Sequence, residues 1–340
     1  MSKKIKLLLV GLSVVLASGS FMACGANEKT EEGGKVETEQ SNDAEGTLYS
    51  YTYNDGTSKV DVSVTKAPQK AVTLSQFMTE MLLALDLGDR MVGTALLDNE
   101  VLPQFKEAYD KVPELEIGEG HSISKEAFVA LSPDFVSGWE MSITNETTGS
   151  AEDLAEDGVY PFVLKSLAGD ATVETVYEDF IALGKIFDVE DKAAKVIEDM
   201  KAKIATVTES LKDIKDEDKI DVMIYDSGEK DAMVVGAGLP NNLITLAGGN
   251  NIYGDLDNTY ETVSFESIVE KNPQVILVTE FMAGDKAVDK IEFLKSHPGL
   301  KNVDAIKNNN FFVMPLADLS PGVRSEKAIT EMNEMFYGQK

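Results

Sequence analysis

Apolar and polar side chains alternate along two short stretches near the start of the folded part of the chain. Tyrosines occupy positions 49, 51 and 53, valines occupy positions 60, 62 and 64, and Asn54-Asp55-Gly56 lies between the two sets. A period of two is typical of a strand with one buried face, and Asp-Gly is a common hairpin turn. We therefore expect the fold to begin near Thr47 with a β-hairpin.

Downstream of residue 70, short apolar runs alternate with amphipathic stretches of helical period. Strands are predicted at 71–74, 91–94, 135–138, 160–164, 220–225, 275–278 and 311–314. Helices are predicted at 78–87, 124–131, 151–157, 239–247, 265–270, 286–296 and 326–336. Strand and helix in alternation are typical of an α/β fold with largely parallel sheets.

A longer helical pattern divides this series into two halves. From Thr172 to Ile186 the apolar residues recur at the spacing of a helix with one buried face, and a second helix is predicted from Asp191 to about Leu211. We therefore expect two α/β lobes, joined by a connecting helix, with a cleft between them. The predicted segments are 1–23 a signal peptide, 24–46 an acidic disordered tether, 47–168 the N-terminal lobe, 169–189 the connecting helix and 190–340 the C-terminal lobe.

The first residues of the chain have the pattern of an export signal. Three lysines precede an apolar run from Leu7 to Ala17, and small and apolar residues follow up to Cys24. The run is shorter than the roughly 20 residues of a membrane-spanning helix, which favours a cleaved signal peptide. Phe21-Met22-Ala23-Cys24 resembles a bacterial lipobox with Phe in place of the usual Leu, and this predicts a lipid on Cys24, palmitate included. The alternative is a plain secreted protein with an unrelated cysteine.

Composition and charge exclude several classes of function. The 340 residues include 31 Lys and Arg against 59 Asp and Glu, a formal net charge of −28. Such acidity argues against nucleic acid as a partner, because phosphates need clustered basic side chains. With 43% hydrophobic and 26% charged residues, the composition is that of a globular protein. Residues 25–46 contain hardly an apolar side chain and are expected to form a solvated tether. Their seven acids should be repelled by anionic lipid headgroups and hold the folded part away from the membrane, although a mere spacer is equally compatible.

Several segments, in order along nearly all of the folded chain, carry a resemblance to a known family. They are Thr79–Leu85 leading to Asp89–Gly93, Glu126–Asp134, Leu246–Asn251, Val263–Glu266 leading to Asn272–Gln274, and Ser320–Arg324. With these segments the chain resembles the substrate-binding lipoproteins of ABC importers for iron-siderophores, haem and cobalamin. The resemblance implies the class III periplasmic-binding-protein fold, a monomer whose two lobes are joined by one rigid helix. It also implies a ligand in the cleft, a permease dimer with cytoplasmic ATPase subunits as partner, and a place on the outer face of the cell membrane.

The resemblance singles out two glutamates as docking residues for the permease. Glu126 and Glu266 each lie at the start of a predicted helix that precedes a Pro-containing turn and an apolar strand. In the family the equivalent acids, one on each lobe, contact arginine pockets of the permease, and charge-assisted contacts of this kind fix orientation and speed encounter. The alternative is that each acid only complements the helix dipole.

Candidate ligand contacts lie on loops at the carboxyl ends of the predicted strands. Trp139, the single tryptophan, and Tyr260 match aromatic positions of cobalamin-binding relatives and suit a half-exposed ligand wall. Arg324, one of only two arginines, lies in a Ser-Pro-Gly loop and is expected to offer a bidentate donor to carboxylate or catecholate oxygens, unless it only pairs with a neighbouring acid. Further wall candidates are Gln76, Phe77, Met78, His121, Met141, Tyr225, Tyr253 and Phe281, although the methionine and the tyrosines could equally be core residues.

Bare-metal and enzymatic functions have little support in the sequence. His121 and His297 are the only histidines, too few for a zinc or manganese site, and no cofactor is expected other than iron inside its chelate. The glycines at 236 and 238 are not followed by the third glycine of a dinucleotide-binding loop. The sequence has no phosphate loop, nucleophile elbow or zinc-hydrolase spacing either, so a lipid-anchored hydrolase remains only a distant alternative. A ferric siderophore is the leading ligand and haem or cobalamin the alternatives, and the negative charge favours a neutral or cationic ferric hydroxamate.

Overall fold

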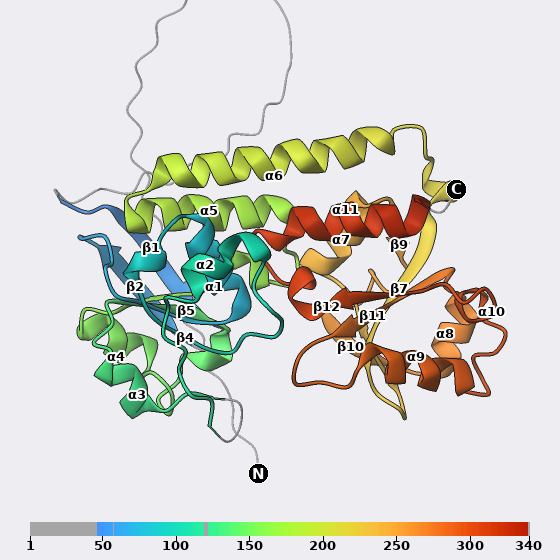
Figure 1. Cartoon of the computed structure of the whole chain (residues 1–340), viewed down its shortest axis with the longest axis horizontal. Helices are drawn as coiled ribbons and strands as arrows, with labels where there is room; N and C mark the ends of the chain where they lie inside the picture. Colours follow the sequence, from blue (N-terminus) through green and yellow to red (C-terminus); the bar gives the residue numbers. More distant parts are fainter. Residues whose placement is uncertain (1–45, 57, 119–121, 339–340) are drawn as a thin grey trace, which may run out of the picture. The chain divides into compact units, whose positions relative to one another are not determined.

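The computed structural model describes residues 46–56, 58–118 and 122–338, which all belong to one compact unit, Asp43–Lys340 (Figure 1). Cys24, the signal peptide, nearly all of the predicted tether and His121 lie outside the described residues. Of the helices in the described ranges, none is long and apolar enough to cross a membrane.

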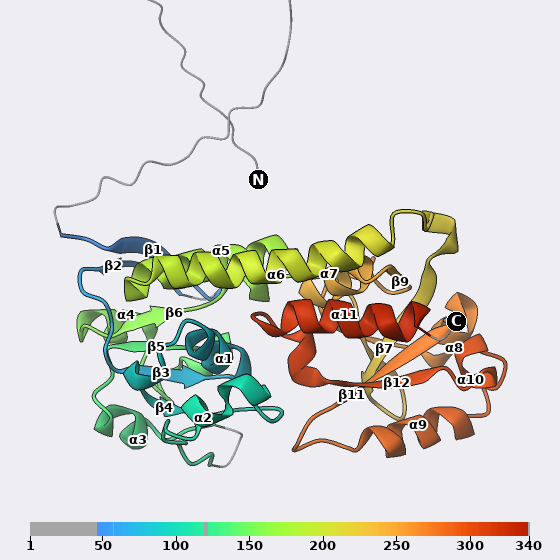
Figure 2. The same cartoon turned by 45° about the horizontal axis from the view of Figure 1, so that its top comes forward.

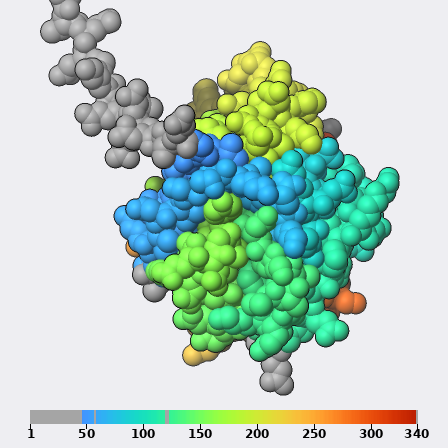
Figure 3. Space-filling model, turned by 90° about the vertical axis from the view of Figure 1, so that its left-hand side faces the viewer, coloured from blue at the N-terminus to red at the C-terminus, as the bar shows by residue number. Residues whose placement is uncertain are grey.

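The predicted hairpin is confirmed at the start of the fold. β1 (Tyr49–Asn54) pairs antiparallel with β2 (Lys59–Val64), and Tyr53, Val62 and Val64 are buried. The hydroxyl of Tyr51 donates to the carbonyl of Pro161 at 2.8 Å. Pro161 lies in β6, the edge strand of the neighbouring sheet, so this bond attaches the hairpin to the N-terminal lobe. In the space-filling view the hairpin and the lobe form one continuous surface (Figure 3).

The N-terminal lobe is built on a parallel four-stranded sheet in the order β4-β3-β5-β6. Every residue of β3 and β5 is buried, as expected for strands covered on both faces. The strands are β3 (Ala71–Leu74), β4 (Met91–Thr94), β5 (Phe135–Gly138) and β6 (Tyr160–Phe162). The helices are α1 (Gln76–Ala84), α2 (Lys106–Tyr109), α3 (Lys125–Ala130) and α4 (Ala151–Glu156), with 3-10 turns η1 (Gly88–Arg90), η2 (Pro103–Phe105), η3 (Glu140–Ser142) and η4 (Lys165–Leu167).

Two antiparallel helices lie where the sequence predicted one connecting helix followed by a first helix of the C-terminal lobe. α5 (Val173–Phe187) begins with a capping box at Thr172 and buries one apolar face. α6 (Glu190–Ser210) lies beside it and runs along both lobes (Figure 2). Asp188, between the two helices, has a left-handed backbone with φ 56°, which turns the chain back on itself.

The C-terminal lobe has a mixed six-stranded sheet whose larger part is parallel, as the expected α/β class requires. β7 (Ile220–Ser227), β9 (Gly249–Asn251), β11 (Val275–Glu280) and β12 (Phe311–Pro315) pair in parallel. β8 (Ala232–Val235) and β10 (Tyr260–Val263) add an antiparallel edge that the pattern did not predict. The helices are α7 (Leu239–Leu246), α8 (Phe265–Lys271), α9 (Ala287–Ser296), α10 (Asp304–Lys307) and α11 (Arg324–Tyr337), with 3-10 turns η5 (Asp216–Asp218) and η6 (Leu316–Leu319).

Candidate functional site

The two lobes meet at the carboxyl ends of their parallel strands. The Asn99 side chain, on the loop after β4, donates to the carbonyl of Glu280 at 3.0 Å and accepts from the amide of Ala317 at 3.0 Å. The amide of Met282, just after β11, donates to the carbonyl of Asp98 at 2.8 Å. Ligands of open α/β sheets bind at this edge, so the interlobe surface is the candidate site.

A small cavity of about 120 Å³ takes its walls from both lobes. Trp139 and the turn at Ser166–Ala168 form one side, and Tyr260 lies on the other. The remaining lining residues are Leu239, Pro240, Thr259, Leu319, Ser320 and Pro321. The cavity therefore brings together the two aromatic residues that the sequence placed in the ligand wall.

The aromatic walls of this cavity are held by neighbours. The rings of Phe77 and Trp139 meet edge to face with centroids 4.9 Å apart, so Phe77, itself buried, supports the indole. Tyr260 is 39% exposed. Burial of its hydroxyl, with the charges of Asp226 and Asp98, raises the pKa of Tyr260, and the phenol remains a neutral hydrogen-bond donor.

A larger cavity of about 410 Å³ lies along the loop that follows β4. Its walls are mostly apolar, with Leu96, Leu115 and Ile117 from the N-terminal lobe and Met282 from the C-terminal lobe. The other lining residues are Ala95, Leu97, Asn99, Glu100, Val101, Lys106, Tyr109 and Glu114. Lys106 is the one cationic residue among the described lining residues of both cavities, and it forms an ion pair with Asp110.

A buried acid on the connecting helix holds the turn that lines the smaller cavity. The Asp179 carboxylate accepts from the amides of Lys165 at 2.9 Å and Ser166 at 3.0 Å, and also from the Ser166 hydroxyl. Burial raises the pKa of Asp179 to about 6, although these hydrogen bonds favour the anion. The sequence analysis missed this residue, whose only signal was an acid on the apolar face of the predicted helix.

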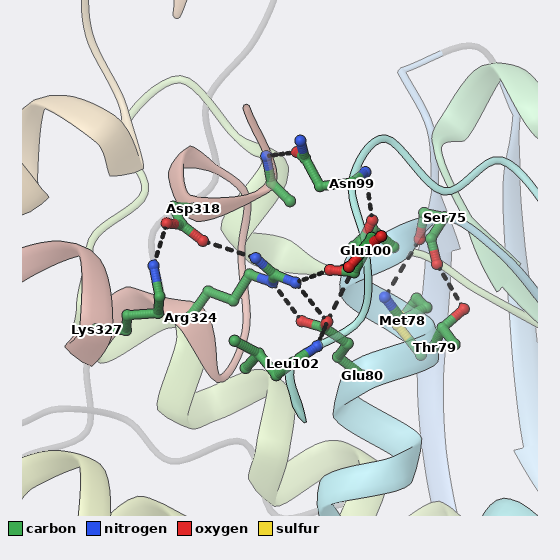
Figure 4. A network of polar contacts seen from close by, with 12 residues as sticks. Ser75, Met78, Thr79, Glu80, Asn99, Glu100, Leu102, Asp318, Arg324 and Lys327 are labelled. Atoms are coloured by element: carbon green, nitrogen blue, oxygen red, sulfur yellow. Dashed lines mark hydrogen bonds and ion pairs between the residues drawn. The ribbon is translucent and has the colours of Figure 1, made fainter. Parts of the chain in front are cut away.

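Arg324 is not free to bind a ligand, and that prediction is wrong. Its Nε and Nη2 donate to the Glu80 carboxylate at 2.6 and 2.7 Å, and its Nη1 donates to Asp318 at 2.8 Å (Figure 4). A further bond from Nη2 reaches the carbonyl of Glu100 at 2.7 Å. Burial lowers the pKa of Arg324, but the hydrogen bonds and charges of Glu80 and Asp318 outweigh it and leave this pKa above the ordinary value. The alternative of pairing with acids is confirmed.

Three other predicted wall residues are buried in the core instead. Met78 has no exposed surface. Tyr225 is buried and donates its hydroxyl to the carbonyl of Gly228 at 2.6 Å. Tyr253 is buried, and its hydroxyl lies 3.1 Å from that of Ser267.

The remaining wall candidates have different positions. Gln76 is buried, and its side chain accepts a hydrogen bond from the Asn99 amide at 2.9 Å. It therefore holds the loop that lines the larger cavity and does not itself line that cavity. Phe281 is half-buried beside Lys290, whose Nζ lies 5.5 Å from its ring centroid. Met141 is 80% exposed and lines a separate hollow next to Glu140. The rule that ligands bind after strands could have identified residues 95–101, which directly follow β4.

The two predicted docking glutamates occupy equivalent places in the two lobes. Each lies in the first turn of a short helix, α3 or α8, and each is exposed. The hydroxyl of Ser124 caps the helix of Glu126, and the hydroxyl of Ser264 caps the helix of Glu266, each accepting the amide three residues later at 3.1 or 3.2 Å. Each helix leads through a Pro-containing turn into a strand, β5 in the N-terminal lobe and β11 in the C-terminal lobe. β5 pairs in parallel with β3, and β11 pairs in parallel with β7.

The described residues contain no group of three or more His, Cys, Asp or Glu side chains that could hold a metal ion.

Comparison with known proteins gives relatives along nearly the whole chain. An ABC transporter substrate-binding lipoprotein of Bacillus subtilis, YvrC, is 24% identical over 329 residues, covering 96% of this chain and 95% of the relative. A vitamin B12-binding protein of Vibrio campbellii is 23% identical and covers 81% of this chain and 92% of its own. The petrobactin-binding protein YclQ of Bacillus subtilis is 22% identical, with 93% and 92% covered.

The fold and a family model give the same assignment. A crystal structure of a periplasmic binding protein from Veillonella parvula matches with a TM-score of 0.78 and 32% identity, covering 86% of this chain and 98% of its own. The model of the periplasmic binding protein family matches residues 72–317. The chain belongs to the periplasmic binding protein family, a class of solute-binding proteins of ABC importers and not of enzymes.

Proposed function

We propose that this protein is the lipid-anchored extracellular receptor of an ABC importer and that it captures a ferric siderophore between its lobes. The observation that carries the proposal is the cavity in which Trp139 of one lobe and Tyr260 of the other line the same space. An indole and a phenol on facing lobes suit the organic surface of a chelate, and a space of about 120 Å³ accommodates one part of it, with the rest of the chelate outside this cavity. The export signal and Cys24 support the anchor.

The charges around the cleft favour a neutral or cationic chelate. Arg324 spends its donors on Glu80, Asp318 and Glu100, and Lys106 is paired with Asp110. Asp226 and Asp98 make the surroundings of Tyr260 negative. An anionic tris-catecholate would meet repulsion without a compensating guanidinium, whereas a ferric hydroxamate would not.

Cobalamin is the second candidate, for a specific reason. A relative is named as a vitamin B12-binding protein, and a large ring system of low charge would pack against an indole and a phenol as readily as a hydroxamate does. Haem, with its two propionates, fits the charge of the cleft less well.

A ligand titration tests the proposal. The mature chain without Cys24 is titrated by calorimetry with ferrioxamine B, a ferric tris-catecholate, hemin and cyanocobalamin. Capture from dilute medium requires a Kd near ~1 µM or below, about −8 kcal/mol. We expect ferrioxamine B to reach this range and the catecholate to bind at least about tenfold more weakly.

Fluorescence of the single tryptophan locates the binding. Saturable quenching of Trp139 by the same ligand, corrected for its own absorbance with free N-acetyltryptophanamide, is expected with the calorimetric Kd. Tyr260→Phe removes one donor and keeps the ring, and serves as a matched variant. Binding of cyanocobalamin alone would make the protein a corrinoid receptor, and binding of none of the four would overturn the chelate assignment.

A further inference from the structure

The loop that follows β4 is bound by both lobes at once. We call residues 98–102 the cleft loop. Within the N-terminal lobe, the amide of Asn99 donates to Gln76 Oε1 and the amide of Leu102 donates to Glu80 Oε1, both at 2.9 Å. From the C-terminal lobe, Arg324 donates to the carbonyl of Glu100 at 2.7 Å. The cleft loop is therefore held within its own lobe by Gln76 and Glu80, whereas its bond from Arg324 exists only while the lobes keep their present separation.

The same arginine joins the lobes through a buried ion pair. Glu80 lies on α1 and Arg324 on α11, 244 residues away, and their bidentate contact has N–O distances of 2.6 and 2.7 Å (Figure 4). The side chains are 1% and 6% exposed. On the C-terminal side, Asp318 binds both Arg324 at 2.8 Å and Lys327 at 2.5 Å. Lys327 also pairs with the partly exposed Glu331 at 2.7 Å, so the network has three acids and two bases, and Glu80, Asp318 and Arg324 are its buried members.

Separating the lobes would break this network at the contact between Glu80 and Arg324. Glu80 would move away with the N-terminal lobe, whereas Asp318 and Lys327 would stay with Arg324. A buried carboxylate that loses its partner is strongly disfavoured, and the planar fork of a guanidinium tolerates little displacement before both bonds to a carboxylate weaken. The contact therefore resists opening more steeply than an apolar surface would.

We propose that the Glu80–Arg324 pair is a latch between the lobes and that it positions the cleft loop as a wall of the ligand site. The two latch residues bind the loop at Glu100 and Leu102, and Asn99, Glu100 and Val101 of the same loop line the larger cavity. Glu80 and Arg324 are thus positioning residues, which act on a ligand through this loop. That part of the inference rests on the proposed function, whereas the latch itself does not.

The first experiment measures the distance between the lobes without any ligand. Spin labels are placed at Val129→Cys on α3 and Val288→Cys on α9, in the full mature chain with Cys24 replaced. These valines are 56% and 59% exposed, and their helices lie on the side of each lobe away from α6 (Figures 1 and 2). We expect one narrow distance distribution in the parent. Arg324→Lys and Glu80→Gln should each raise the fraction at longer distance by about tenfold or more.

The matched control is Arg90→Lys, which alters the other arginine of the chain. Arg90 donates to the carbonyl of Phe187 at 2.9 Å and takes no part in the contact between Glu80 and Arg324. It should leave the distance distribution unchanged. An unchanged distribution in both latch variants would overturn the proposal.

Hydrogen exchange separates a latch from a general loss of stability. In Arg324→Lys, amides of the cleft loop should exchange about tenfold faster, while those of the central strand β7 keep the parental rate. Equal acceleration in both segments would mean that the arginine only stabilises the fold, and the proposal would fail. Since neither experiment contains ligand, a failure of the proposed function would show only in the titrations.

Discussion

Two opposing effects act on the pKa of Asp179, the buried acid next to the smaller cavity, and they decide how stability depends on pH. Asp179 is 1% exposed on α5, and its carboxylate accepts three hydrogen bonds from Lys165 and Ser166. The bonds favour the anion, and burial favours the neutral acid. Burial prevails and raises the pKa of Asp179 from 3.8 to about 6.

The direction and size of the effect on stability follow from this shift. Because the pKa of Asp179 is higher in the folded chain, the folded state binds the proton more tightly between pH 4 and 6. The favourable contribution is complete below about pH 4 and is lost as the pH rises through about 6. At about 1.36 kcal/mol per pKa unit, the loss amounts to roughly 3 kcal/mol.

Urea unfolding of the parent and of Asp179→Asn measures this pH-dependent loss of stability. The free energy of unfolding is determined from pH 4 to 7.5 for the parent and for Asp179→Asn, and the difference between them is plotted against pH. The parent should lose roughly 2–3 kcal/mol relative to the variant across this range. Glu174→Gln, on the exposed face of the same helix, should show no such trend. A difference that rises with pH would mean that the hydrogen bonds outweigh burial, which would refute the reasoning.

Three further predictions concern the docking surface, the sheet and the cleft. Replacing both Glu126 and Glu266 with alanine should abolish uptake of radiolabelled ligand by cells and leave the Kd of the purified protein unchanged; a weakened Kd would place these acids in the ligand site. Gly138→Ala should destabilise the fold by roughly 1–3 kcal/mol in urea unfolding, because the added Cβ would lie 2.4 Å from the carbonyl oxygen of Leu74. Trp139→Ala should weaken the bound chelate about tenfold or more in calorimetry, and an unchanged Kd would exclude the indole from the site.

Sequence patterns predicted most of the elements but not their limits or the antiparallel edge. The two four-residue strands β8 and β10 are too short for their alternation to stand out from loop sequence. The predicted start of the first helix was two residues late, because Ser75 caps α1 by accepting the amide of Met78 at 3.2 Å. As a result Met78, expected in the cleft wall, lies inside the helix and faces the core.

Candidate wall residues could be predicted where a local rule applied, namely that ligands bind after strand ends. They could not be predicted where a partner distant in the sequence determines the position of a side chain. Trp139 follows a strand end, and Tyr260, which the family resemblance singled out with it, lines the same cavity, while their contact with a ligand stays a prediction. Tyr225 also comes near a strand end, but its side chain points to the covered face of β7. The role of Arg324 depends on Glu80, 244 residues earlier, and no spacing in the sequence reveals that pair.

The latch and the docking surface depend on the same property of the molecule, the position of one lobe relative to the other. Glu126 and Glu266 lie on equivalent helices of different lobes, so the distance between them changes whenever the lobes move. A permease that contacts both acids at once therefore responds to that distance, in the same way that a symmetric partner selects one spacing of its two contacts. The Glu80–Arg324 pair, together with the bonds of Asn99 and Met282 between the lobes, restrains this distance from inside the protein, although it lies neither at the predicted docking glutamates nor in the aromatic cavity. If both acids dock on a permease, we expect Arg324→Lys to reduce uptake even though Arg324 touches neither of them, and unchanged uptake at unchanged ligand affinity would contradict this link.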